Sequence, residues 1–136
     1  MPAQPFELTV RVYWADTDAG GVVYHSNYLD YCERARTEWL RQQGFSQQRL
    51  ASEEGVLFTV ATLQIDFRRP ARLDDLLTVR TRAELGGGAT VEFVQEVWRE
   101  SPTAELLATA QVRVACVDAA SFKPRRLPVS IREGFA

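Results

Sequence analysis

Residues 13–39 read YWADTDAGGVVYHSNYLDYCERARTEW and join a turn-rich run to a long amphipathic helix. The run DTDAGG at 16–21 is rich in Asp and Gly, which is typical of a turn. Beyond it, apolar side chains recur at helical spacing and form one stripe, made of Tyr28, Tyr31, Cys32, Ala35 and Trp39. Ser26 or Asn27 is predicted to cap the start of this helix, and Gly44 is predicted to end it.

Hydrophobic patterns of period two lie on both sides of this segment and predict strands. Residues 6–14 alternate apolar and polar side chains, as a half-buried strand does. The alternation over 56–67 changes parity near Ala61–Thr62, and a β-bulge explains this because one extra residue flips the face. Glycines at 86–88 predict a hairpin turn, and Ser101 is predicted to begin another. Three more alternating runs cover 77–85, 91–98 and 106–116.

The predicted order is one strand, one long helix and four strands joined mostly by short turns, and short turns demand antiparallel neighbours. The sequence therefore predicts an α+β fold in one domain, 1–136, with a five-stranded antiparallel sheet curled around the helix. One helix cannot cover both faces of such a sheet, so we expect self-association to protect the other face or an edge. Val94, Trp98 and Leu107 are candidates for a second apolar surface, although single apolar residues on a surface are also common.

Composition excludes several functional classes. The chain has 136 residues, 46% of them hydrophobic, which suits one domain with its own core. Its 16 Lys and Arg against 18 Asp and Glu give a net charge of −2, which argues against a nucleic-acid binder, although a local basic patch stays open. No apolar run approaches the ~18 residues that span a bilayer, and the N-terminus does not resemble a signal peptide. We therefore expect a cytoplasmic protein, whose two cysteines are too few for a disulfide scaffold.

The turn and the helix start bring together the parts that acyl transfer needs. Helix N-termini expose unpaired N–H groups with partial positive charge, which suit a carbonyl oxygen that becomes an oxyanion. A carboxylate from Asp16 or Asp18 beside them could act as base or nucleophile. Both acids also fit a simpler interpretation as turn residues that bond the local backbone, and the lone His25 fits one as a structural histidine. The sequence shows no Ser or Cys nucleophile motif and no metal-ligand cluster, so no metal or cofactor is expected.

The run DTDAGGVVYHSNYLDYCERARTEWL resembles the signature of the hotdog-fold acyl-CoA thioesterases of the 4-hydroxybenzoyl-CoA thioesterase type, and most of all their Tol–Pal-associated branch. The FRRPA run at 67–71, followed by Leu73-Asp74-Asp75, resembles the central strand pair of that family. The resemblance implies a hotdog fold and an enzyme that hydrolyses acyl-CoA to a free acid and coenzyme A. It also implies a site between two subunits, hence a homodimer or homotetramer.

By position in the motif, the resemblance assigns the essential carboxylate to Asp18, which attacks the thioester carbonyl or activates a water to do so. It implies that the backbone N–H of His25 polarises the carbonyl at the helix entry, while the imidazole orients water or stabilises the departing thiolate. Tyr24 and Asn27 would shape the mouth of the pocket and the helix start, and Asp16 would organise the turn.

Coenzyme A carries several phosphate charges, and Arg binds phosphate through its planar fork. We expect Arg68 and Arg69 to bind substrate, each against the alternative of solvated surface charge. Strand alternation would place these two side chains on opposite faces, so they are not expected to act together.

Two other functions stay open. A hotdog dehydratase acting on hydroxyacyl thioesters pairs a histidine with an acid, but here Asp18 precedes His25 in the thioesterase order. A non-catalytic thioester-binding or scaffold protein would use the same cleft, and the intact Asp18 with its glycine turn argues against it. The sequence does not set the acyl chain that is preferred.

Overall fold

The computed structural model describes residues 5–100 and 102–135. Ser101, which the sequence places at the start of a turn, lies outside the described residues. The strands are β1 (Phe6–Arg11), β2 (Val56–Phe67), β3 (Leu76–Leu85), β4 (Thr90–Arg99) and β5 (Glu105–Asp118). The helical elements are the 3-10 helix η1 (Trp14–Asp16), α1 (His25–Gln42), α2 (Gln47–Arg49), the π-helix η2 (Leu50–Glu54) and α3 (Val129–Glu133).

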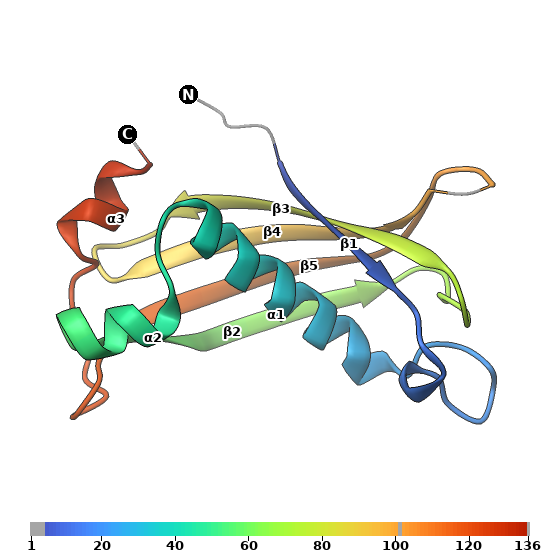
Figure 1. Ribbon diagram of the computed structural model, residues 1–136, viewed down its shortest axis with the longest axis horizontal. Helices are drawn as coiled ribbons and strands as arrows, with labels where there is room; N and C mark the ends of the chain where they lie inside the picture. Colours follow the sequence, from blue (N-terminus) through green and yellow to red (C-terminus); the bar gives the residue numbers. More distant parts are fainter. Residues whose placement is uncertain (1–4, 101, 136) are drawn as a thin grey trace.

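The five strands form one antiparallel sheet in the order β1-β3-β4-β5-β2. Helix α1 lies across one face of this sheet, and the short α2 and α3 gather at one end (Figure 1). This is the hotdog arrangement, so the prediction of an α+β fold with a five-stranded sheet around one long helix is confirmed. The segment between β1 and α1, which holds the predicted site, lies at the other end of the sheet, where β2 ends (Figure 1).

The core lies between α1 and the sheet. The predicted helix stripe is confirmed, since Tyr28, Tyr31, Cys32 and Ala35 are all buried, while Trp39 is half-buried against Phe93. Burying one large apolar side chain contributes roughly 1.5–3 kcal/mol, so this stripe fixes the helix on the sheet.

A closed polar network lies inside this core. Gln95 is fully buried, and its Nε2 donates to the Cys32 carbonyl at 2.9 Å and to Thr81 Oγ1 at 3.0 Å. Arg36 Nη1 donates to Gln95 Oε1 at 3.0 Å. Because its amide is satisfied at both ends, Gln95 joins the middle of α1 to β3 and β4 without an unpaired buried group.

Two irregularities shape the sheet. The pairing of β2 with β5 shifts between Val60 and Thr62, which confirms the bulge predicted from the change of parity. The pairing of β4 with β5 also shifts, because Val97 pairs with Ala108 and Trp98 with Leu106. This second shift skips Leu107, whose side chain is fully buried, so the prediction of Leu107 on a second apolar surface was wrong.

The other two candidates for that surface differ from each other. Val94 is exposed on the face away from the helix. Trp98 is half-buried, and the Arg80 guanidinium stacks over its ring at 4.9 Å. The outer face thus carries charged pairs together with exposed aliphatic side chains, among them Val94 and Leu76.

The ends of α1 follow the sequence only in part. Gly44 has φ +94° just beyond the last turn, as a glycine that ends a helix often does, which confirms its predicted role. The predicted cap was wrong: the helix begins at His25, and Tyr24 precedes it without a side-chain cap. Asn27 lies inside the first turn, where its Nδ2 donates to the Asp16 carbonyl at 2.7 Å.

Candidate active site

The segment between η1 and α1 folds into a tight turn with Asp18 at its corner. Thr17 and Val23 form an antiparallel bridge, the Asp18 N–H donates to the Val22 carbonyl at 2.9 Å, and the Gly21 N–H donates to the Asp18 carbonyl at 3.0 Å. Gly21 has φ +78°, a left-handed conformation that glycine adopts without steric cost. The sequence prediction of a turn at 16–21 is therefore confirmed.

The Asp18 carboxylate is exposed and only partly engaged. Its Oδ1 accepts the Gly20 N–H at 2.8 Å, which is the local backbone bond of a turn aspartate. A Cβ placed on Gly20 would lie 3.2 Å from the same oxygen, so the glycine leaves room for the carboxylate. Among the described residues no donor reaches Oδ2, which leaves one oxygen for chemistry.

Asp16 holds the turn through one carboxylate oxygen and its backbone carbonyl. Its Oδ2 accepts the Tyr13 N–H at 2.9 Å and the Tyr31 hydroxyl at 2.9 Å. Its carbonyl accepts the Tyr24 N–H and the Asn27 amide, at 2.9 and 2.7 Å. Burial raises the pKa of Tyr31, and the bond to Asp16 raises it further, so the phenol stays a donor. The two acids thus differ in what their carboxylates hold: that of Asp16 bonds Tyr13 and Tyr31, whereas the exposed carboxylate of Asp18 bonds only the Gly20 N–H.

The first turn of α1 offers the donors that the sequence predicted. Among the described residues, the N–H groups of His25 and Ser26 donate to no protein acceptor, whereas the Asn27 N–H already bonds the Tyr24 carbonyl at 2.9 Å. These free amides stand at the positive end of an 18-residue helix. They can hold a carbonyl oxygen as negative charge develops on it.

Aromatic side chains surround the helix start. The His25 ring lies 4.3 Å from the Tyr24 ring and 6.5 Å from the Phe67 ring, centroid to centroid. Phe67 also packs edge-on against Tyr28 at 5.2 Å, yet half of it stays exposed. Sequence reasoning did not include Phe67 in the site, although its place in the FRRPA run marked the strand end that meets the turn.

Arg68 and Arg69 follow β2 and leave the sheet. Both backbone N–H groups donate to the Leu107 carbonyl, at 2.8 and 3.2 Å, and both side chains are exposed. The expectation of opposite faces does not apply, because the strand ends at Phe67.

A second loop, 70–75, is hydrogen-bonded to the segment that carries Asp18. The Val23 N–H donates to the Ala71 carbonyl at 2.9 Å, and Val22 forms a bridge with Arg72. The Ala71 N–H donates to the hydroxyl of buried Tyr28, also at 2.9 Å. The chain therefore brings residues about 50 positions apart to the same site, which local sequence patterns do not reveal.

A cavity of about 330 Å³ lies farther along α1, away from the helix start. Helix α1 forms one wall, and β2, β4, β5, α2 and α3 form the others. The lining is mainly apolar and aromatic, with polar residues from α1, and includes Arg36, Trp39, Phe58, Val60, Phe93 and Val114. Its composition suits a hydrocarbon group.

The two cysteines belong to the core. Cys32 is fully buried in α1, and burial raises the pKa of its thiol to about 11. Burial also raises the pKa of Cys116 on β5. Since the thiolate is the nucleophile, neither group is prepared for catalysis at neutral pH.

Comparison with known proteins gives a consistent family. A family model described as "Thioesterase-like superfamily" matches residues 12–135. The chain is 48% identical over 130 residues to the acyl-CoA thioesterase YbgC of Haemophilus influenzae, covering 96% of this chain and 93% of that protein. It is also 48% identical over 126 residues to the acyl-CoA thioester hydrolase YbgC of Escherichia coli, covering 93% of this chain and 92% of that protein.

Solved structures agree with these relatives. A probable thioesterase from Bartonella henselae superposes with a TM-score of 0.85 at 42% identity, covering 91% of this chain and 99% of that one. A 1,4-dihydroxy-2-naphthoyl-CoA thioesterase from Synechocystis superposes with a TM-score of 0.89 at 29% identity, covering 96% of this chain and 95% of that one.

Proposed function

The chain belongs to the thioesterase-like superfamily and is a thioester hydrolase, and we propose that its substrate is acyl-coenzyme A, cleaved to a free carboxylic acid and coenzyme A. The observation that carries the proposal is the pairing of two features. One is the free Oδ2 of Asp18 on its glycine turn, and the other is the pair of unengaged amides at His25 and Ser26. Thioester hydrolysis needs a nucleophile or base, which the carboxylate can supply, and an oxyanion site, which the amides can supply.

Asp18 acts by one of two routes. As a nucleophile, its oxygen bonds to the carbonyl carbon, the C–S bond breaks, the thiolate takes a proton from water, and a second water hydrolyses the mixed anhydride. As a general base, it takes a proton from water as the water oxygen attacks, and the proton passes to the thiolate when the C–S bond breaks. Rapid quenching and mass spectrometry separate the routes, because only the first puts the acyl mass on Asp18.

The helix start holds the carbonyl while Asp18 reacts. The His25 N–H donates to the carbonyl oxygen, and the helix end favours the charge that develops there. The His25 imidazole orients water or stabilises the thiolate. Tyr24 and Asn27 shape the mouth and the helix entry, and the Asn27 bond to the Asp16 carbonyl supports that role. Arg68 and Arg69, both exposed just beyond the end of β2, pair with coenzyme A phosphates.

The protein works as a homodimer or homotetramer in this proposal. Strand β2 lies at the edge of the sheet and exposes Val60, Leu63 and Phe67. An exposed edge with apolar side chains is a template for pairing with a second copy. Antiparallel pairing of two β2 edges about a twofold axis puts the Phe67 end of one copy beside the Val56 end of its partner. The apolar cavity of the partner then lies near the Asp18 turn and receives the acyl group.

The proposed location is the cytoplasm, where acyl-coenzyme A and reduced thiols are available. Both cysteines are free in the structure, in line with a reducing compartment. Among the described residues, no helix is both long enough and apolar enough to cross a membrane.

A free-thiol assay on short-chain, long-chain and aromatic acyl-coenzyme A tests the proposal. Release of thiol with a matched amount of free acid is the expected result. An enoyl product without thiol release would instead favour a dehydratase. Binding of coenzyme A thioesters with neither product would favour a scaffold protein. Asp18→Asn serves as the control for hydrolysis by a contaminating enzyme.

A further inference from the structure

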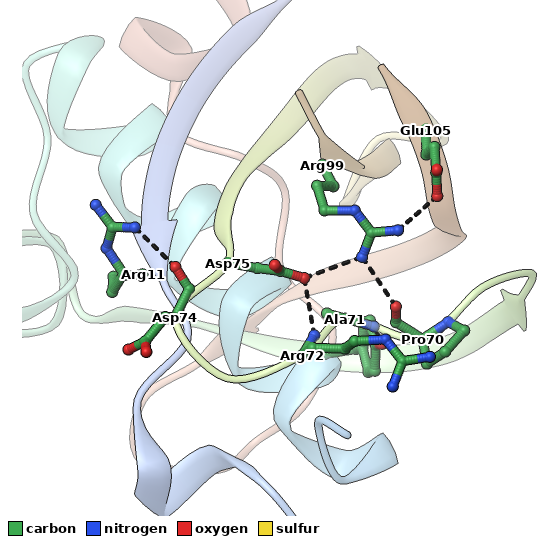
Figure 2. Close-up of polar contacts among 9 residues, drawn as sticks. Arg11, Pro70, Ala71, Arg72, Asp74, Asp75, Arg99 and Glu105 are labelled. Atoms are coloured by element: carbon green, nitrogen blue, oxygen red, sulfur yellow. Dashed lines mark hydrogen bonds and ion pairs between the residues drawn. The ribbon is translucent and has the colours of Figure 1, made fainter. Parts of the chain in front are cut away.

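We propose that Arg99, near the end of β4, is a positioning residue that sets the place of the Asp18 carboxylate through loop 70–75. The inference rests on the proposed role of Asp18. Among the described residues Arg99 makes no hydrogen bond to Asp18 or to the start of α1. It reaches them in two steps, because it bonds loop 70–75 (Figure 2) and the loop bonds the backbone on either side of the turn.

The first step joins Arg99 to loop 70–75. Its Nη1 donates to Asp75 Oδ2 at 2.9 Å and to the Pro70 carbonyl at 3.1 Å, so one guanidinium nitrogen holds both ends of the loop (Figure 2). Its Nη2 pairs with Glu105 on β5, which fixes the guanidinium from the other side. The Arg99 side chain is only 16% exposed, so these charged bonds are less screened than surface pairs.

Asp75 also keeps the loop in shape. The Oδ2 that accepts from Arg99 accepts the Arg72 N–H at 2.8 Å, and the Asp75 N–H donates to the Arg72 carbonyl at 3.1 Å. Asp74 has φ +71°, a conformation that side-chain-bearing residues rarely adopt, and its carbonyl accepts Arg11 Nη1 at 2.8 Å. The loop therefore depends on bonds from outside its own sequence.

The second step joins the loop to both ends of the segment that carries Asp18. At one end, Val12 exchanges two backbone bonds with the loop: its N–H donates to the Asp75 carbonyl at 2.9 Å, and its carbonyl accepts the Asp74 N–H at 3.1 Å. At the other end, the Val23 N–H donates to the Ala71 carbonyl at 2.9 Å. A shift of the loop thus moves the segment that carries the carboxylate.

The same loop also holds the helix that supplies the amides, because the Ala71 N–H donates to the Tyr28 hydroxyl at 2.9 Å. Loop 70–75 is therefore the shared support of the carboxylate and the oxyanion donors. Their relative placement controls the rate, since a displacement of about 1 Å can cost roughly 100-fold. Arg99 fixes this support to the sheet, so its loss is expected to lower turnover although it is remote from the substrate.

Arg80 provides a matched control. It also lies on the sheet and pairs with two carboxylates, Glu7 at 2.8 Å and Glu100 at 3.0 Å. Its side chain is 33% exposed, and within the described part of the chain it makes no hydrogen bond to loop 70–75 or to residues 12–24. Arg80→Gln therefore removes a comparable pair of ion pairs without touching the support of the site.

The test compares kcat, KM and Tm of Arg99→Gln and Arg80→Gln with those of the wild type, at temperatures equally far below each Tm. Arg99→Gln is expected to lower kcat by about 10- to 100-fold while KM changes by less than about threefold. Arg99→Lys, which retains one charged donor, is expected to recover part of kcat. Arg80→Gln is expected to keep kcat within about twofold. Equal kcat losses for Arg99→Gln and Arg80→Gln would overturn the proposal.

Amide hydrogen exchange tests the same link without activity. In Arg99→Gln the Val23 N–H is expected to exchange faster, while amides in the middle of β4 and β5 keep their protection. Asp75→Asn, which keeps the side-chain shape, is expected to show the same pattern if Arg99→Gln does not fold. Unchanged exchange at Val23 in a folded Arg99→Gln or Asp75→Asn would overturn the proposal. Absence of thiol release by the wild type would instead contradict the proposed function.

Discussion

The two halves of α1 use polar groups in opposite ways. At its start, the His25 and Ser26 amides and one oxygen of Asp18 have no protein partner among the described residues. At its middle, the amide of Gln95 is satisfied by Thr81, Arg36 and the Cys32 carbonyl. One polar set is exposed and open to a substrate, and the other is buried and closed. The contrast separates groups that can react from groups that hold the fold.

Replacement of the Asp18 carboxylate is expected to have the largest effect on turnover. Asp18→Asn removes the base or nucleophile and should lower kcat by about 100-fold or more, as loss of a catalytic acid–base group does. The exposed side chain makes one local bond, so Tm should hardly change. Thiol release and thermal unfolding measure the two effects. His25→Ala is expected to be milder, because the backbone N–H remains.

Asp16→Asn tests whether Asp16 and Asp18 have different roles. Asp16 Oδ2 accepts bonds from Tyr13 and Tyr31, so this variant should lower both Tm and kcat by loosening the turn. If Asp18→Asn kept full activity while Asp16→Asn lost it without a change in Tm, the roles assigned to the two acids would be reversed.

Crowding the free carboxylate is expected to have an intermediate effect. A Cβ on Gly20 would lie 3.2 Å from Asp18 Oδ1, so Gly20→Ala should push the carboxylate aside and lower kcat by about tenfold. Gly87→Ala is the matched control, because its Cβ would meet only Thr90 Oγ1 at 3.9 Å on the distant hairpin. Steady-state kinetics of both variants decide the point, and equal kcat values would contradict the crowding of Asp18.

The sequence predicted the elements of the fold more fully than the contacts between them. The alternation of apolar and polar residues predicts the strands, because a strand that buries one face has an apolar residue at every second position. The change of parity in this alternation predicts the bulge near Ala61. The second bulge was missed because Leu106 and Leu107 are both apolar, so parity does not show which one faces the helix. Likewise, Asn27 has the residue type of a cap but bonds the Asp16 carbonyl instead.

The candidate site likewise has one part that the sequence predicts and another that only the folded structure shows. Asp18, the glycine turn and the helix start lie within one continuous run, so a motif could identify them. The contribution of Phe67 and of loop 70–75 depends on contacts with the His25 ring and the Val12 and Val23 backbone, about 40 to 60 residues away, and no local pattern encodes such contacts. Arg99 lies farther still along the chain, and only the folded geometry connects it to Asp75.

Breaking the closed polar network is expected to change stability and leave the reaction intact. Gln95→Met removes the partner of Arg36 and Thr81 inside the core, so the free energy of unfolding should fall by about 1–3 kcal/mol. Urea denaturation measures that loss. The kcat at a temperature well below the midpoint should stay within about twofold of the wild type. A large loss of kcat in a fully folded Gln95→Met would mean that the middle of α1 also takes part in catalysis.

Modification of the buried Cys32 thiol is expected to have the smallest effect on activity. Burial raises the pKa of Cys32 from its ordinary value near 9 to about 11, so the native state keeps the proton longer than the unfolded chain. The stabilisation is present below pH 9 and is lost as pH rises toward 11. In Cys116→Ala, where Cys32 is the only thiol, a disulfide reagent at pH 8 should react slowly and leave activity unchanged.

The same reagent should modify Cys32 at once when the chain is unfolded in guanidinium chloride, and increasingly fast in the native state above pH 10. Rapid modification of native Cys32 at pH 8 would place this thiol in contact with solvent. If activity then fell in proportion to the modified fraction, the part of α1 that supports the reaction would extend from its start past Cys32. Slow modification of Cys32 with full activity would show that the reactive part of α1 is limited to its first turn, which holds the unengaged amides.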